Sequence, residues 1–221
     1  MAPVAVLLAG GGSTRMGRDK AGLEIDGETL VERHLRQLRG AGVTDPVVVC
    51  NPANHEAIRR RTGARTLLQI GDGMSAAVRT GLEAARPAGT VWLVCINDII
   101  GDADYAKIAD AAAGDGIVIP TKVLDRVFHG GHLLLHGDQV RAIAEKPPGG
   151  CRPGAYANIM VHRVSGGRAI EALAAATDYE GAVNELIDAG VAVRAAPVDF
   201  WIAVKTPEDF KRLGELRSPG R

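Results

Sequence analysis

The chain has few aromatic residues, few cysteines and no excess of charge of either sign. Aromatic side chains make up 4% of its 221 residues, and Lys+Arg and Asp+Glu each number 26. Nucleic-acid-binding domains usually carry an excess of positive charge, so the composition argues against that class. The three cysteines, Cys50, Cys95 and Cys151, contain no CxxC pair and are odd in number, which argues against a disulfide framework or a zinc site. A reducing cytoplasm is therefore the expected location.

The sequence also lacks a long hydrophobic segment. The apolar run at residues 3–9 is far shorter than the ~20 residues of a membrane-spanning helix. It also lacks the basic region that begins a signal peptide. We therefore expect neither export nor membrane insertion. With 46% hydrophobic and 24% charged residues, the chain has the composition of a globular protein, and its length fits one α/β domain.

Apolar runs and helix-like segments alternate through the first half of the chain. Residues 3–9 form a continuous apolar run that ends in three glycines, which is typical of a strand buried on both faces. The alternation predicts a Rossmann-like, mostly parallel sheet with helices on both faces, a fold that binds ligands beyond the carboxyl ends of its strands. Further strands are expected at 46–50, 64–69 and 91–96, and helices at 28–38, 54–61 and 75–85.

The second half has a mixed pattern. Two short apolar runs flank Gly137-Asp138, which predicts a β-hairpin formed by residues 132–136 and 139–144. Thr206 followed by Pro207 predicts the start of a last helix that runs to about residue 216. The fold class is therefore α/β, with a mixed hairpin region after the parallel core. Other elements expected here are strands at 117–119, 155–161 and 191–198 and helices at 169–176 and 179–189.

A glycine-rich loop joins the first strand to the first helix. Its glycines, Gly10, Gly11 and Gly12, allow backbone N–H groups to turn toward phosphate oxygens. The loop is not a dinucleotide-binding fingerprint, because Arg15 stands where the third glycine is needed. It is not a Walker loop either, because Gly17 is followed by Arg and Asp instead of Lys and Ser or Thr.

The segment LAGGGSTRMGRDK resembles the signature of the nucleotidyltransferase superfamily, which includes sugar-1-phosphate nucleotidyltransferases and molybdenum-cofactor guanylyltransferase-like enzymes. The resemblance implies a glycosyltransferase-A-like nucleotidyltransferase fold in a single domain, 1–221. Residues 1–113 would bind the nucleotide, and residues 114–221 the acceptor. It implies catalytic roles on the phosphates for Arg15 and Lys20, whose charges can straddle a triphosphate. The expected nucleotide-binding residues of the loop are Leu8, Ala9, Gly10, Gly11, Gly12, Ser13 and Thr14.

Four later features match the same family in the expected order. The segment from Gln69 through Gly73 to Ser75 resembles the one that receives the nucleobase. Asp98 follows the most apolar strand and, by resemblance, binds Mg²⁺, a cation that prefers oxygen ligands. Glu145-Lys146-Pro147 resembles a motif whose Glu contacts a sugar hydroxyl and whose Lys, a catalytic residue, holds the acceptor phosphate. Asn158 resembles an asparagine beside the acceptor.

The chain departs from the family near its end. Related enzymes carry a second metal-binding acid two residues after the tryptophan that corresponds to Trp201, and this chain has Ala203 there. Asp199 cannot replace that acid, because four strand residues span about 13 Å. Either one carboxylate suffices, another group replaces the second acid, or the protein is impaired.

The expected reaction needs no catalytic base. An acceptor phosphate has a second pKa near ~6, so it is mostly a dianion at pH 7 and can attack the α-phosphorus of an NTP directly. The resemblance therefore implies transfer of NMP to a phosphorylated small molecule, foremost a sugar-1-phosphate, with release of pyrophosphate. Three alternatives stay open: a cytidylyltransferase for a phosphonate or phosphocholine-like acceptor, a molybdopterin guanylyltransferase-like enzyme, and a catalytically impaired nucleotide-binding regulator. The sequence also leaves the base and the oligomeric state open.

Overall fold

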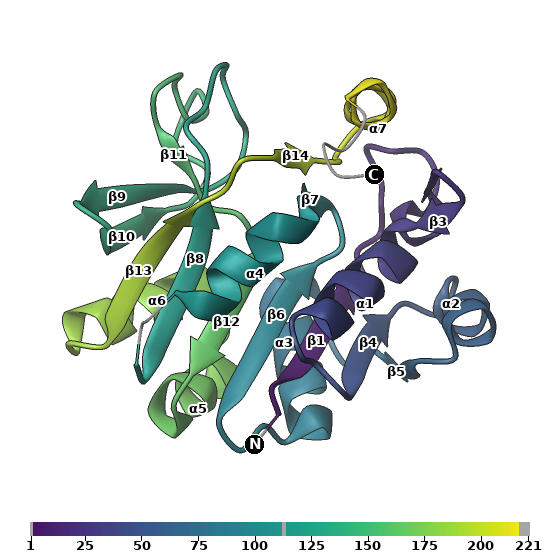
Figure 1. The fold of residues 1–221 in the computed structure, drawn as a ribbon, viewed down its shortest axis with the longest axis horizontal. Coiled ribbons are helices and arrows are strands. Elements are labelled where there is room, and N and C mark those ends of the chain that lie inside the picture. The colour runs from purple at the N-terminus through teal and green to yellow at the C-terminus, as the bar shows by residue number, and fades with distance from the viewer. Residues whose placement is uncertain (1, 112–113, 217–221) are drawn as a thin grey trace.

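The structure is a computed structural model that describes residues 2–111 and 114–216. These residues form a ten-stranded sheet with the strands in the order β11-β9-β10-β13-β8-β12-β6-β1-β4-β5 (Figure 1). The strands of this sheet are β1 (Val4–Ala9), β4 (Pro46–Cys50), β5 (Arg65–Leu68), β6 (Thr90–Cys95), β8 (Gly116–Thr121), β9 (His132–His136), β10 (Gln139–Ala144), β11 (Tyr156–Ala157), β12 (Val161–Ser165) and β13 (Ala192–Pro197).

The half of the sheet formed by the first part of the chain is parallel. β1 pairs in parallel with both β4 and β6, and β4 pairs in parallel with β5. β12 is antiparallel to its neighbours β6 and β8, and the hairpin β9–β10 and strand β11 extend the other edge in antiparallel pairing. The predicted α/β class and the mixed hairpin region are confirmed.

Helices cover both faces of the sheet. α1 (Leu30–Gly40) and α4 (Asp102–Asp110) lie on one face, and α3 (Gly73–Ala85), α5 (Gly167–Ala175) and α6 (Tyr179–Asp188) lie on the other, while α2 (His55–Thr62) lies near the β5 edge (Figure 1). Alternate side chains of β6 enter the two cores, because strand residues point to opposite faces: Trp92 packs on the α1 side and Leu93 on the α3 side. Among the described residues, no helix is long and apolar enough to cross a membrane.

A third, smaller core lies beyond the carboxyl ends of the parallel strands. Buried Met16 of the glycine loop packs there with Ile99, Ile202 and Val204. The glycine loop is thereby held against a pair of short strands formed by distant parts of the chain. The elements around this core are the 3₁₀ turn η1 (Lys20–Gly22), β2 (Glu24–Ile25), β3 (Glu28–Thr29), β7 (Asp98–Ile100), β14 (Trp201–Ala203) and α7 (Pro207–Glu215).

A buried histidine on α1 fixes the end of β6. His34 Nδ1 accepts a hydrogen bond from the Tyr105 hydroxyl at 2.7 Å, and Nε2 donates to the carbonyl of Ile96 at 3.2 Å. Nε2 carries the proton because a carbonyl oxygen can only accept. Burial lowers the pKa of His34 to about 4, so the ring is neutral at pH 7.

A second histidine makes the same kind of pair on the other face of the sheet. His162 on β12 accepts from the Tyr179 hydroxyl at 2.8 Å through Nδ1 and donates to Oδ1 of Asn158 at 3.0 Å through Nε2. Burial lowers its pKa to about 3. The neutral ring thus orients Asn158, one of the residues expected to bind the acceptor.

Two expectations about local structure are corrected, and one helix was not predicted. The expected single strand at 155–161 is wrong, because the chain forms two strands there, β11 and β12. Residues 158–160 cross from the β9 side of the sheet to β6. The Asn158 N–H donates to the Gly131 carbonyl at 2.9 Å, and the Met160 carbonyl accepts from the Cys95 N–H at 2.7 Å. α4 is not expected from the sequence, because it buries only two apolar side chains, Tyr105 and Ile108. The helix expected from residue 28 begins at residue 30, because residues 28–29 form β3. The expected boundary after residue 113 lies outside the described residues.

Gly81 allows α3 to pack closely on β1. A Cβ at this position would collide with the fully buried side chain of Val6. Gly81→Ala should therefore lower the free energy of unfolding by about 1–3 kcal/mol, the usual cost of overpacking. The matched change Gly214→Ala in α7, where an added Cβ meets nothing within 4 Å, should be neutral or stabilise by up to about 1 kcal/mol. Urea unfolding at pH 7 measures both, and equal stability of the two variants would contradict the close approach.

The two buried histidines should make stability depend on pH. In the unfolded chain imidazoles titrate near 6.5, whereas the folded pKa values are about 4 for His34 and about 3 for His162. Below pH 6.5 the unfolded chain takes up protons that the folded chain excludes, so stability falls as the pH falls, by about 1.4 kcal/mol per pH unit for each histidine. We expect His162→Gln to remove about half of this slope between pH 6.5 and 4.5.

Urea unfolding of the wild type and the variant at pH 7, 6, 5 and 4.5 measures that slope. His136→Gln is the control, because His136 lies exposed at the end of β9. A slope in His162→Gln equal to that of the wild type would contradict the assignment of a neutral buried imidazole.

Candidate active site

Two adjoining cavities open at the carboxyl ends of the parallel strands. The first has a volume of about 340 Å³ and lies between the glycine loop and the start of α3. The second has a volume of about 720 Å³ and lies between β7, the loops beside the β9–β10 hairpin and the start of α6. Lys20, Cys95 and Asn97 line both cavities. We refer to the two together as the active-site cleft.

The glycine loop forms one wall of the first cavity. The loop turns at Ser13, whose φ of 50° lies in the left-handed region, and the Met16 N–H donates to the Ser13 carbonyl at 2.9 Å. The Ser13 hydroxyl accepts from the Lys20 N–H at 3.2 Å, so the loop folds back and carries Lys20 to the cavity. Of the residues expected to bind the nucleotide, Thr14 lies in a separate shallow hollow beside Asn51. The loop residues that do line the first cavity are Leu8, Ala9, Gly10, Gly11, Gly12 and Ser13.

Gln69 forms the opposite wall of the first cavity. Its Nε2 donates to the carbonyls of Gly71 and Gly73 at 2.9 and 3.0 Å. Its Oε1 lies against Gly10, where an added Cβ would collide with it. Gly10 is therefore required for this close approach. Ser75, also expected near the nucleobase, lines the second cavity.

Asp98 is a buried carboxylate on the floor of the second cavity, with 7% of its surface exposed. Oδ1 accepts from the indole Nε1 of Trp201 at 2.9 Å, and Oδ2 accepts from the Met160 N–H at 3.4 Å. Burial raises the pKa of Asp98, although the Trp201 hydrogen bond and the nearby ammonium groups of Lys205 and Lys20 act in the opposite direction. The carboxylate charge is incompletely compensated, which favours the approach of a further cation.

The strand pairing shows where a second acid at residue 203 would lie. β7 and β14 pair so that Ala203 lies directly opposite Asp98. Residues directly opposite each other in an antiparallel pair have Cβ atoms about 4.5–5.5 Å apart, so an acid at 203 would lie next to Asp98. Asp199 is engaged elsewhere, in an ion pair with Lys107 at 2.5 Å. The chain supplies one carboxylate at this place.

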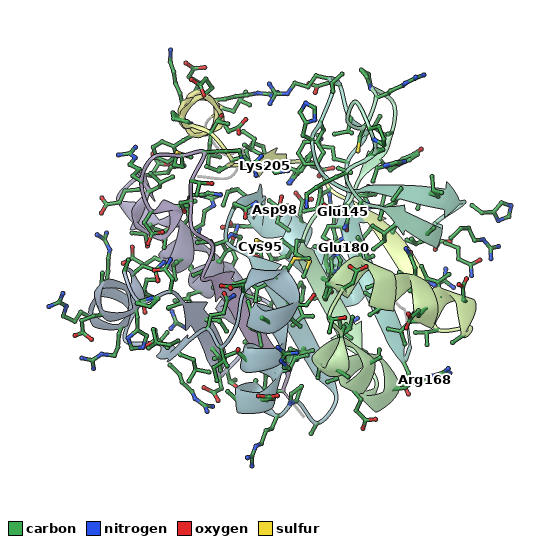
Figure 2. All side chains as sticks on the ribbon, turned by 180° about the vertical axis from the view of Figure 1, so that it is seen from behind. Cys95, Asp98, Glu145, Arg168, Glu180 and Lys205 are labelled. Carbon is green, nitrogen blue, oxygen red and sulfur yellow. The ribbon has the colours of Figure 1, made fainter. Side chains whose placement is uncertain are left out.

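Three cationic side chains face the cleft without a carboxylate partner. Arg15 lines the second cavity, Lys20 lines both, and Lys205 lines the second. None of the three makes an ion pair within 4.0 Å to a carboxylate of the described residues, whereas Lys107 and Lys146 do. Cations left unpaired around a cleft form a binding site for an anion. Figure 2 shows Lys205 close to Asp98 and Cys95 at this end of the molecule, with Arg168 at the opposite end.

The predicted acceptor residues lie on the far side of the second cavity. Glu145 and Lys146 form an ion pair at 3.1 Å, and Lys146 has a φ of 42°, which is uncommon for a residue other than glycine. Asn158 lines the same cavity. Strained backbone of this kind is often kept at functional sites. The structure thus brings Glu145, Lys146 and Asn158 together.

Sequence reasoning missed several charged residues of the cleft, among them Lys205 and Glu180. Lys205 lies two residues past Ala203, within the segment that departs from the family, and its charge was the available signal. Glu180 stands in the first turn of α6, where an acid is ordinary in any helix, so the sequence gives no distinct signal. Burial raises the pKa of Glu180.

Cys95, which lines both cavities, offers no nucleophile. Its thiol donates to Oδ1 of Asn97 at 2.9 Å, and burial raises its pKa to about 12. The thiol is therefore protonated at neutral pH, and a protonated thiol is not a nucleophile. The cleft contains charged and hydrogen-bonding groups that can position phosphates, and this arrangement suits phosphoryl chemistry by positioning and charge stabilisation.

Known proteins resemble this chain in sequence and in fold. A probable molybdenum cofactor guanylyltransferase from Opitutus terrae is 42% identical over 95 residues, which cover 41% of this chain and 44% of that relative, so the match spans less than half of the relative's length. A solved structure of a putative glucose-1-phosphate thymidylyltransferase from Bacillus anthracis superposes with a TM-score of 0.83 at 14% identity, covering 100% of this chain and 97% of that one. The inositol-1-phosphate CTP transferase from T. maritima superposes with a TM-score of 0.74 at 14% identity, covering 93% and 90%.

The two solved structures share the fold with this chain, as the predicted nucleotidyltransferase fold requires. The family model described as the MobA-like NTP transferase domain matches residues 5–193, which include the glycine loop, Asp98 and the residues predicted to bind the acceptor. The chain therefore belongs to the MobA-like NTP transferase family within the nucleotidyltransferases.

Proposed function

We propose that this protein transfers a nucleoside monophosphate from an NTP to the phosphate of a small molecule, that the acceptor is a sugar-1-phosphate, and that Mg²⁺ is required. The observation that carries the proposal is the convergence of two unpaired cations, Arg15 and Lys20, on a cleft whose floor is the buried carboxylate of Asp98. Family membership supports the NTP as donor. The proposed acceptor and the proposed metal are supported by the chemistry of the groups that line the cleft.

The glycine loop and its cations would hold the triphosphate. Loop backbone N–H groups and the charges of Arg15 and Lys20 would bind the phosphate oxygens, with the base in the first cavity against Gln69. An acceptor phosphate oxygen in the second cavity then forms a bond to the α-phosphorus. The bond from that phosphorus to the bridging oxygen of the β-phosphate breaks, and pyrophosphate leaves with the electron pair. Positive groups placed before the reaction stabilise the negative charge that builds on the leaving oxygen.

Asp98 fits a magnesium site that is completed by the substrate. Among the described residues, no group of three or more His, Cys, Asp or Glu side chains could hold a metal by itself. Mg²⁺ is commonly held by one or two carboxylates together with substrate phosphates and water, and a single buried carboxylate beside a phosphate loop fits that pattern. Bound there, the ion would neutralise charge on the phosphates. Trp201 and the Met160 N–H would orient the carboxylate.

The far side of the second cavity suits an acceptor with hydroxyl groups. Glu145, Glu180 and Asn158 line it, and carboxylate and amide groups accept and donate the hydrogen bonds that a sugar requires. Lys146 supplies a positive charge for the acceptor phosphate. The two superposed structures are those of a putative glucose-1-phosphate thymidylyltransferase and an inositol-1-phosphate CTP transferase, which agrees with this acceptor class.

A second candidate is guanylyl transfer to a molybdenum cofactor precursor. The family model and the relative from Opitutus terrae favour it. Glu145-Lys146-Pro147 and the segment from Trp201 to Pro207 favour the sugar phosphate. Both reactions release pyrophosphate, so the acceptor decides between them.

A panel assay tests the proposal. Pyrophosphate release should be measured with each common NTP and with sugar-1-phosphates, phosphocholine and molybdopterin as acceptors, in Mg²⁺ and in EDTA. We expect turnover with a sugar-1-phosphate and Mg²⁺. Turnover with molybdopterin alone would identify the second candidate, and nucleotide binding without turnover would identify a regulator.

Arg15→Ala should lower kcat/KM by about 10²- to 10³-fold, the usual effect of removing one group that stabilises developing charge. Circular dichroism should be unchanged, because Arg15 contributes no carboxylate ion pair within the described residues. Arg168→Ala is the matched control: Arg168 lies on α5 at the opposite end of the molecule (Figure 2). Activity of Arg15→Ala within threefold of Arg168→Ala would remove the loop cation from the mechanism.

Lys146→Met tests the acceptor side. Loss of one charge-assisted contact should raise the KM for the acceptor by about tenfold or more and leave the KM for the NTP unchanged. Initial rates at varied concentrations of each substrate separate the two effects. An equal rise in both KM values would place Lys146 on the nucleotide instead of the acceptor.

A further inference from the structure

Lys205 lies between two cavities of the protein and lines both. Its Nζ donates to the carbonyl of His129 at 2.8 Å and lies 3.9 Å from the centre of the Phe128 ring. Its side chain lines the second cavity of the cleft and also a neighbouring groove of about 370 Å³. An ammonium group has three N–H donors, and only one has a partner among the described residues. Two donors remain for a ligand.

The surroundings of Lys205 hold it close to Asp98. The Trp201 indole donates a hydrogen bond to Asp98 and contacts the Phe128 ring edge-on, with ring centres 5.1 Å apart. The Phe128 ring in turn makes a cation–π contact with the Lys205 ammonium. Burial lowers the pKa of Lys205, and the charge of Asp98 acts in the opposite direction; the charge of Arg15 also lowers this pKa, and that of Glu145 raises it. These contacts join four groups in one packed series: the Asp98 carboxylate, the Trp201 indole, the Phe128 ring and the Lys205 ammonium.

Lys205 adds positive charge beside the position of the second acid, where this chain has Ala203. A second acid opposite Asp98 would bind magnesium together with Asp98, so positive charge there would come from the ion. A lysine supplies positive charge without a metal. Ala203 lies opposite Asp98, and Lys205 follows two residues after the end of β14.

We propose that Lys205 binds the triphosphate directly and supplies positive charge that a site with a second carboxylate would obtain from bound magnesium. This inference rests on the proposed function, because it places the triphosphate in the same cleft. Arg15, Lys20 and Lys205 would then act together on the phosphates. A carboxylate at residue 203 would be dispensable.

Binding measurements on the 221-residue chain test the role of Lys205 separately from turnover. Calorimetry in Mg²⁺ first identifies which of ATP, GTP, CTP and UTP binds most tightly. The affinity for that NTP, for its nucleoside and for inorganic tripolyphosphate is then compared between the wild type and Lys205→Met, in Mg²⁺ and in EDTA. Lys205→Met should weaken NTP and tripolyphosphate binding by about 10- to 100-fold and leave the nucleoside affinity unchanged.

Three further variants act as controls for charge and folding. Lys205→Arg keeps the charge and should bind the NTP within a few-fold of the wild type. Lys205→Gln keeps a donor for the His129 carbonyl and should lose affinity as Lys205→Met does. Lys211→Met removes a lysine from α7 that lines none of the described cavities and should change nothing.

The double variant Ala203→Asp, Lys205→Ala tests the exchange of charge for metal. The measured quantity is the ratio of the NTP dissociation constant in EDTA to that in Mg²⁺. This ratio should be at least tenfold larger for the double variant than for the wild type. An unchanged ratio would contradict the exchange.

The outcomes separate the inference from the proposed function. If the wild type binds no NTP, the proposed function fails. A second outcome would overturn the role of Lys205 and leave the proposed function standing. In it, the wild type binds an NTP and Arg15→Ala loses that binding, but Lys205→Met and Lys205→Gln bind the NTP within twofold of the wild type. A lower melting temperature of Lys205→Met with an unchanged ratio of nucleoside to NTP affinity would assign Lys205 to packing alone, which also overturns it.

Discussion

The pairing of β7 with β14 is the constraint on which the cleft depends. It brings the end of the chain back over the end of β6, where the Val204 N–H donates to the carbonyl of Asn97 at 2.7 Å and Trp201 covers Asp98. Without this pairing Asp98 would lie in a solvated loop. In water its attraction for a cation would be several times weaker than in a partly buried site, because the effective dielectric constant is higher. The strand pair therefore determines the strength of the site as well as its position.

The same small core restrains the glycine loop. A loop rich in glycine loses more conformational freedom on ordering than other sequences do, so a ligand that had to order it would bind more weakly. Met16 packs beside Ile99 and Ile202, and Asp19 caps the turn η1 by accepting from the Ala21 N–H at 2.9 Å. These contacts hold both ends of the segment that carries Arg15 and Lys20. The cations are thereby placed before the nucleotide arrives, and little binding energy is needed to arrange them.

The parts predicted from the sequence are those that short stretches of chain determine. Continuous apolar runs predict the positions of β1 and β6, and the glycines predict the loop after β1. The position of Asp98 at the cleft is predicted by its place after the most apolar strand. The division of the expected strand at 155–161 was not predictable, because it depends on which distant strands each half joins. Lys205 was missed for the same reason: its proximity to Asp98 arises from the pairing of segments about a hundred residues apart. Glu180 carries no local signal at all.

The charge of Lys205 bears on how the cleft could work with a single acid at the β7–β14 pair. A triphosphate carries about four negative charges at pH 7, so each cation that faces it lowers the charge that bound magnesium must neutralise. A lysine is charged at any magnesium concentration, whereas a bound ion must be recruited. In the proposed role, Lys205 would therefore reduce the dependence of nucleotide binding on free Mg²⁺, with its ammonium group held by the Phe128 ring and the His129 carbonyl.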